Sequence, residues 1–173
     1  MKIYTKKGDS GTTSSFSGRT YRKDDTLIEL NGLIDETIVS ISLAKTVLVN
    51  KQQQKQFNKI IEAMYLLGAE VSNGKTTGLT KYIDKGFVTK LEDEIDSFDY
   101  KINGFMYFST KEALYCEEAR VKVRKLERFA TKLLRHEQLR ETIYAYLNRL
   151  SDYLFVVSIC LEKHYKGDEL LEN

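Results

Sequence analysis

The chain has 173 residues and contains no proline. Proline is the strongest helix breaker, because it lacks the N–H that a helix needs and clashes with the preceding turn. Turns must therefore be built from ten glycines together with Asn, Asp and Ser. Apolar residues recur every three to four positions along five segments, the period of amphipathic helices. We predict helices over residues 24–49, 51–73, 87–98, 110–135 and 139–165, the first of them capped by Asp24 or Asp25.

Five helices joined by short links predict an all-α fold, a five-helix up-and-down bundle. We expect a single domain over residues 1–173, in which residues 24–173 form the bundle and residues 1–23 form a loop across one end. The length and the 42% of hydrophobic residues are sufficient for one sizeable core.

The net charge is only +2 at pH 7, which argues against a general nucleic-acid binder. The two cysteines, Cys116 and Cys160, have no metal-ligand or redox spacing and indicate reduced thiols. The N-terminus lacks the apolar run of a signal peptide, and no apolar run is long enough to span a bilayer. We expect a cytoplasmic protein that binds neither nucleic acid nor membrane.

A row of arginines is the most distinctive feature of the fourth predicted helix. Arg120, Arg124 and Arg128 recur every four residues and share one face. They flank an apolar stripe of Ala119, Val123, Leu126, Ala130 and Leu133. Guanidiniums beside a packed face suit carboxylates or phosphates. The alternative is a solvated basic face with i,i+4 charge pairs.

The segment 6–18 has the composition of a loop that wraps phosphates. It holds three glycines, two lysines and several hydroxyl side chains. Glycine lets backbone N–H groups approach oxygen atoms closely, and hydroxyls donate to them. The segment has no Walker A pattern, so a flexible terminus is the alternative.

Several positions leave two readings open. Gly32 in mid-helix costs about 1 kcal/mol against Ala, which suggests a close contact with another helix or a ligand. Asp35 either pairs with a guanidinium across an interface or faces solvent. Residues 105–108 either enter the core, which we favour, or line a cavity. Asn148 and Asp152 either position a ligand or tie the fifth helix to the fourth through Arg120 or Arg128.

Five segments taken together resemble the PduO-type ATP:cob(I)alamin adenosyltransferases, in the family's order and over the whole chain. They are residues 5–14, 23–25, 32–36, 120–128 and 147–155, which read TKKGDSGTTS, KDD, GLIDE, RVKVRKLER and LNRLSDYLF. The resemblance implies a homotrimer of ferritin-like five-helix bundles that binds ATP and the corrinoid between neighbouring subunits.

The resemblance also implies roles for individual residues. The loop around the triphosphate would comprise Thr5, Lys6, Lys7, Gly8, Thr13 and Ser14, with Lys23 as a further phosphate ligand. The other wall of the ATP site would comprise Arg124, Lys125, Leu126, Glu127 and Arg128, with Asn148 contacting the nucleotide. Arg124, Arg128 and Lys23 would be the catalytic cations. Asp35 and Arg120 would bridge subunits on the corrinoid side, and Phe105 would lie against the lower face of the corrinoid.

The implied reaction moves the 5′-deoxyadenosyl group of ATP to cob(I)alamin, giving adenosylcobalamin and triphosphate. Co(I) is itself the nucleophile, so no general base is needed, and we expect His136 and His164 to be surface residues. Mg²⁺ would be bound by the phosphates, with no metal-binding residues in the protein. A cobalamin reductase or a cobalamin-dependent enzyme would be the protein partner.

Two other hypotheses remain at this point. One is an ATP-binding trimer that holds or delivers a corrinoid without turnover, and the other is a purely structural oligomer. The chain also departs from the family's pattern. It lacks the usual Pro-Gly-Gly turn before the fourth helix, has Lys125 and Leu126 for an arginine and an alanine, and has Thr37 for a leucine.

Overall fold

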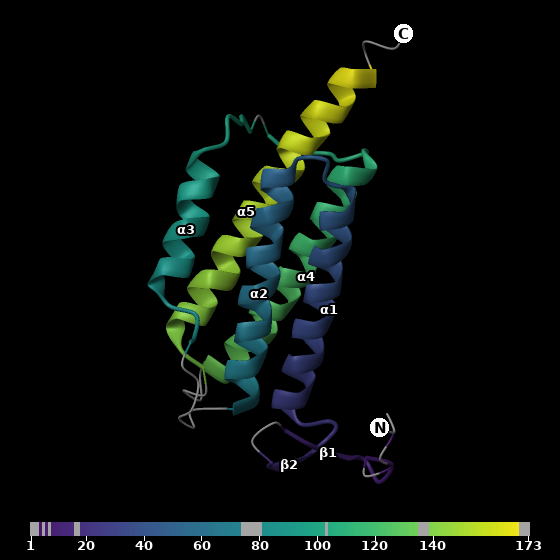
Figure 1. The fold of residues 1–173 in the computed structure, drawn as a ribbon, viewed down its shortest axis with the longest axis vertical. Helices are drawn as coiled ribbons and strands as arrows, with labels where there is room; N and C mark the ends of the chain where they lie inside the picture. Colours follow the sequence, from purple (N-terminus) through teal and green to yellow (C-terminus); the bar gives the residue numbers. More distant parts are fainter. Residues whose placement is uncertain are drawn as a thin grey trace.

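The structure is a computed structural model that describes residues 4, 6, 8–15, 18–73, 81–102, 104–134 and 139–169. Within them it has five helices and one two-stranded hairpin (Figure 1). The helices are α1 (Thr26–Val47), α2 (Lys51–Asn73), α3 (Lys85–Asp96), α4 (Lys111–Leu134) and α5 (Glu141–Glu169). The hairpin consists of β1 (Thr12–Ser14) and β2 (Thr20–Arg22). Successive helices run in opposite directions, so the predicted up-and-down bundle is confirmed.

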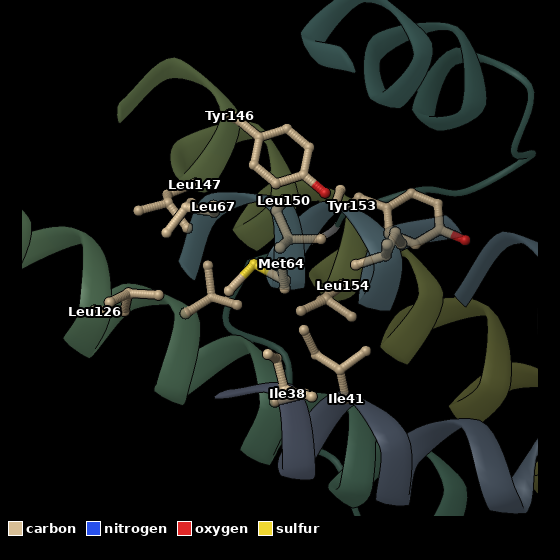
Figure 2. Packing of buried hydrophobic residues seen from close by; sticks show 14 of the residues in the cluster. Ile38, Ile41, Met64, Leu67, Leu126, Tyr146, Leu147, Leu150, Tyr153 and Leu154 are labelled. Atoms are coloured by element: carbon tan, nitrogen blue, oxygen red, sulfur yellow. The ribbon is translucent and has the colours of Figure 1, made fainter. Parts of the chain in front are cut away.

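The core is formed by the apolar faces of all five helices. Helix α4 packs most extensively against α5 and α1, α2 covers α1, and α3 packs against α5 from the outside. Figure 2 shows Ile38, Met64, Leu126 and Leu150 pointing into the same interior from four different helices. Fully burying one such side chain stabilises the fold by about 1.5 to 3 kcal/mol.

The close helix contact predicted at Gly32 is absent from the described part of this chain. A Cβ atom at Gly32 would meet nothing within 4 Å, and the residue is exposed on α1. At Gly68 on α2, a Cβ atom would lie 3.5 Å from a methyl carbon of Ile34, which is an ordinary van der Waals distance. Gly68 therefore faces α1, but the contact there leaves room for a methyl group.

The N-terminal hairpin was not predicted. Strand β1 pairs antiparallel with β2, with Thr12 opposite Arg22, and the Lys23 N–H donates to the Gly11 carbonyl at 2.9 Å. Gly11 has φ of 82°, a conformation that glycine adopts without strain. The hairpin lies at the end of the bundle where α1 begins (Figure 1). The expected position of the N-terminal segment across one end is therefore confirmed for its described residues.

The chain enters α1 and α3 through aspartate caps. The Asp25 carboxylate accepts from the Leu27 N–H at 2.9 Å, so Asp25 caps α1, whereas Asp24 pairs with Arg22. The Asp84 carboxylate accepts from the N–H groups of Gly86 and Phe87, at 2.9 and 3.3 Å. This cap explains why α3 begins two residues before the predicted start at 87.

Our prediction that residues 105–108 enter the core is wrong for half of the segment. Phe105 is 100% exposed and Tyr107 is 77% exposed, whereas Phe108 packs partly against the core. The Phe108 ring meets the Phe155 ring of α5 edge to face, with centroids 6.0 Å apart. Apolar composition could not show which of these rings the connection turns outward.

Replacing Asp84 by alanine should destabilise α3 locally. The change removes the acceptor for two N–H groups at the N-terminus of α3, and loss of such a cap costs about 0.5 to 2 kcal/mol. We expect faster amide hydrogen exchange in the first turn of α3 and unchanged exchange in α4. Equal acceleration in both helices would contradict the local effect.

Candidate functional site

Two arginines of α4 lie exposed and one turn apart without a counter-ion. Among the described residues, neither Arg124 nor Arg128 makes an ion pair or a side-chain hydrogen bond. Ala119, Val123, Leu126 and Ala130 of the apolar stripe beside them are at most 1% exposed, so the helix cannot rotate to bring the arginines inward. Two uncompensated guanidiniums in fixed register have the charge and geometry that suit a multiply charged anion. The structure thus disfavours the alternative in which these two arginines form charge pairs within the helix.

Glu127, the acid that lies between these two arginines in the sequence, accepts a hydrogen bond from another helix. Asn148 of α5 donates through its amide to Glu127 Oε1 at 3.1 Å. Glu127 and Asn148 were both predicted to contact the nucleotide, and the structure brings them together. Asn148 therefore ties α5 to α4 through Glu127 and not through Arg120 or Arg128. Asp152 instead pairs with Arg149 of its own helix at 2.6 Å.

The third arginine of the row behaves differently. Arg120 is half-buried, pairs with Glu117 at 2.8 Å, and lies over the Phe155 ring at 5.5 Å from its centroid. Asp35 of α1 is exposed and has no ion pair or hydrogen bond to its side chain within the described residues. The proposed Asp35–Arg120 pair is therefore not formed within one chain. Asp35 remains available for a contact with another molecule.

Lys125 and Leu126 hold α4 in place. Lys122 and Lys125 reach Glu36 of α1 at 2.9 and 3.5 Å, and the hydrogen bond from Lys122, with the charges of both lysines, lowers the Glu36 pKa. Leu126 is 0% exposed and lies in the core. Its side chain cannot form part of a nucleotide-binding wall, which corrects that prediction. The other members predicted for that wall, Arg124, Lys125, Glu127, Arg128 and Asn148, remain predictions.

The N-terminal hairpin brings Lys23 close to Gly8. A Cβ atom at Gly8 would lie 3.4 Å from Lys23 Nζ and 3.2 Å from the Thr12 carbonyl oxygen. Only glycine therefore fits here without displacing its neighbours. Lys6 and Ser14 are exposed and Thr13 is half-buried. Thr5 and Lys7, which we also predicted as triphosphate ligands, lie outside the described residues.

The described residues contain no cluster of side chains that could hold a metal ion. No group of three His, Cys, Asp or Glu side chains among them could hold a metal ion. His164 is exposed beside Tyr165, as predicted, and His136 lies outside the described residues. Burial, with a smaller contribution from Glu117, raises the pKa of Cys116 to about 12, so this thiol is not an activated nucleophile.

A cavity of about 870 Å³ opens between α2 and α3, with α5 as its floor. Its lining includes no residue of α1 or α4, so it lies apart from the arginines. Its charged residues are three lysines and three acids, namely Lys59, Lys81, Lys90, Glu62, Asp93 and Glu94. Because these charges balance, the cavity does not suit a triphosphate.

Comparison with known proteins gives one consistent family. The family model for cobalamin adenosyltransferase matches residues 3–161. A corrinoid adenosyltransferase of Bacillus subtilis (strain 168) is 33% identical over 168 residues, covering 91% of this chain and 85% of that protein. A corrinoid adenosyltransferase of Citrobacter freundii is 29% identical over 160 residues, covering 89% of this chain and 91% of that protein.

The fold agrees with solved structures. A variant PduO-type ATP:corrinoid adenosyltransferase from Lactobacillus reuteri, complexed with cobalamin and ATP, has a TM-score of 0.85 at 22% identity. The match covers 95% of this chain and 96% of that one. The fold and the site together define a class of protein, namely five-helix bundles whose fourth helix carries arginines. The chain belongs to the cobalamin adenosyltransferase family, which confirms the resemblance seen in its sequence.

In the described part of the chain, no helix has the length and apolarity to cross a membrane.

Replacing Leu126 by alanine should lower stability without weakening ATP binding. Loss of a fully buried leucine costs about 2 to 5 kcal/mol of unfolding free energy. We expect a lower urea midpoint and an ATP dissociation constant within about twofold of the original, because the side chain faces the core. The control is Lys132→Ala, which removes an exposed side chain further along the same helix. Loss of ATP affinity in the folded Leu126→Ala protein would show that this residue does contribute to the nucleotide site.

Proposed function

We propose that the protein transfers the 5′-deoxyadenosyl group of ATP to cob(I)alamin. Co(I) attacks the 5′ carbon, a cobalt–carbon bond forms, and the bond from that carbon to the triphosphate oxygen breaks. The triphosphate leaves with the electron pair of the broken bond, and cobalt is formally oxidised from Co(I) to Co(III). The metal supplies the nucleophile, so the protein needs no general base. Its task is to align the two substrates and to stabilise the leaving group.

The observation that carries this proposal is the unpaired state of Arg124 and Arg128. Negative charge grows on the triphosphate as the bond to carbon breaks, and fixed cations at that position lower the barrier. Lys23 beside Gly8 supplies a further cation from the hairpin. Mg²⁺ would enter bound to ATP, because phosphate oxygens are ligands that it prefers. Arg124, Arg128 and Lys23 are the residues that we assign to leaving-group stabilisation.

We further propose that three copies assemble into the active form. Helix α1 exposes Gly32, Asp35, Val39 and Leu43 at a spacing that places them on one face. The neighbouring α4 exposes Leu114, Val121 and Arg128 seven residues apart, again on one face. Apolar side chains exposed beside Asp35 and Arg128 favour burial against another copy. Such an assembly would let the hairpin of one copy meet the arginines of the next.

The corrinoid side of the site would be formed by Asp35, Arg120 and Phe105. Asp35 is unpaired within the described chain and would reach an arginine of a neighbouring subunit. The fully exposed Phe105 would offer an apolar surface to the lower face of the corrinoid. The reaction consumes Co(I), so a reductase must supply it. The partners we propose are therefore a cobalamin reductase or a cobalamin-dependent enzyme that takes up the product, in the cytoplasm.

An anaerobic spectral assay tests the reaction directly. Cob(I)alamin is mixed with ATP and protein, and loss of its absorbance reports formation of the cobalt–carbon bond. Heat released on titration with ATP alone, measured by calorimetry, distinguishes a nucleotide-binding protein from a structural oligomer. ATP binding without spectral change would support a carrier of corrinoid and would contradict the transferase.

Replacing Arg124 by alanine should lower turnover by about 10² to 10³, because one preorganised cation at the leaving group is lost. The control is Lys132→Ala, which removes one positive charge from an exposed position two turns further along α4. Initial rates are measured at saturating substrates, and native mass is measured by light scattering. Near-normal turnover of Arg124→Ala in an intact oligomer would refute the phosphate role.

Replacing Asp35 by asparagine should impair use of the corrinoid more than binding of ATP. The side chain keeps its size but loses the charge that would pair with an arginine of the neighbouring subunit. We expect the KM for cob(I)alamin to rise about tenfold, the scale for loss of a charged hydrogen bond, while the ATP dissociation constant changes little. Equal losses for both substrates would count against this assignment.

A further inference from the structure

Glu162, near the C-terminal end of α5, receives an unusual number of hydrogen bonds. The N–H and hydroxyl of Ser109 donate to Glu162 Oε1 at 3.1 and 2.8 Å. The N–H and hydroxyl of Thr110 donate to Glu162 Oε2 at 2.9 and 2.8 Å. Lys166 adds an ion pair at 2.7 Å. Five donor groups converge on one carboxylate that is only 4% exposed.

These bonds keep the carboxylate ionised. Burial acts to raise the Glu162 pKa, but the hydrogen bonds from Lys166, Thr110 and Ser109 outweigh it and lower the pKa to about 2. The carboxylate also lies at the N-terminus of α4, where the helix dipole favours negative charge. Glu162 is therefore a fixed negative charge that fastens the start of α4 to α5.

The segment fastened in this way has few other attachments. Within the described residues, Gly104 to Phe108 make no hydrogen bond, and Gly104 has a φ of 87°. The second anchor is the Phe108 ring, which packs edge to face on Phe155. The same Phe155 ring carries the Arg120 guanidinium at 5.5 Å. A continuous set of contacts therefore runs from Glu162 through residues 108–110 to Phe155 and Arg120.

We propose that Glu162 is a positioning residue for the corrinoid side of the site. It holds the segment 105–108 in register with Arg120 and so fixes the place from which Phe105 projects. Glycine and proline can fix the turn before a helix through their backbone conformation. In this chain the turn before α4 is instead held by the carboxylate of Glu162, which is distant in sequence and binds Ser109 and Thr110. This inference rests on the proposed function, since it assigns Glu162 to the handling of the corrinoid.

The principal test is Glu162→Gln, with Glu141→Gln as the control at an exposed acid on the other end of α5. Glutamine keeps the size but loses the charge. We expect the KM for cob(I)alamin to rise about tenfold, the scale for hydrogen bonds to a charged group, with the ATP dissociation constant within about twofold. Ser109→Ala, which removes a single donor, should give a smaller effect in the same direction and keeps the test open if Glu162→Gln folds poorly.

A double-mutant cycle with Phe105→Ala separates positioning from general stabilisation. If Glu162 acts through Phe105, the effect of Glu162→Gln on the corrinoid KM should largely disappear when Phe105 is already alanine. Additive effects, or equal losses for ATP and corrinoid, would overturn the inference while leaving the transferase intact. A wild-type protein that binds ATP but leaves cob(I)alamin unchanged would instead refute the proposed function, and this inference with it.

Discussion

Burial of one face of α4 is the constraint on which the rest of the structure depends. Ala119, Val123, Leu126 and Ala130 are at most 1% exposed, because α4 packs between α5 and α1. Because α4 is held in this way, side chains spaced four residues apart on its other face cannot turn toward the core. Arg124 and Arg128 consequently remain at the surface, and the core that stabilises the bundle also sets the register of the two residues that we propose to bind the triphosphate.

The polar contacts around α4 divide its charged residues into two groups. Glu36 engages Lys122 and Lys125 across two helices, and Glu117 engages Arg120 along α4, so the charges of these three cations are compensated within the chain. Glu127 is occupied by Asn148. Arg124 and Arg128 are left with their charge uncompensated in the described chain. A cationic pair kept apart from available carboxylates suits a ligand that brings its own negative charge, as a triphosphate does.

The two ends of the bundle have different roles in this proposal. The hairpin with Gly8 and Lys23 lies where α1 begins, and the exposed aromatic segment 105–108 precedes α4 at the opposite end (Figure 1). One bundle therefore does not bring its own Phe105 to its own hairpin. A second copy would complete the proposed site by packing on the exposed faces of α1 and α4, which carry Asp35, Val39 and Val121.

The sequence by itself determined the five helices, the arginine row and the family, because helical periodicity and the spacing of short motifs are local properties of the chain. It did not determine the hairpin, whose pairing of Thr12 with Arg22 depends on a turn between them. Nor did it separate the exposed Phe105 from the packed Phe108, or reveal Glu162, which meets Ser109 from 53 residues away. Those features depend on which segments meet in space, and only the tertiary structure decides that.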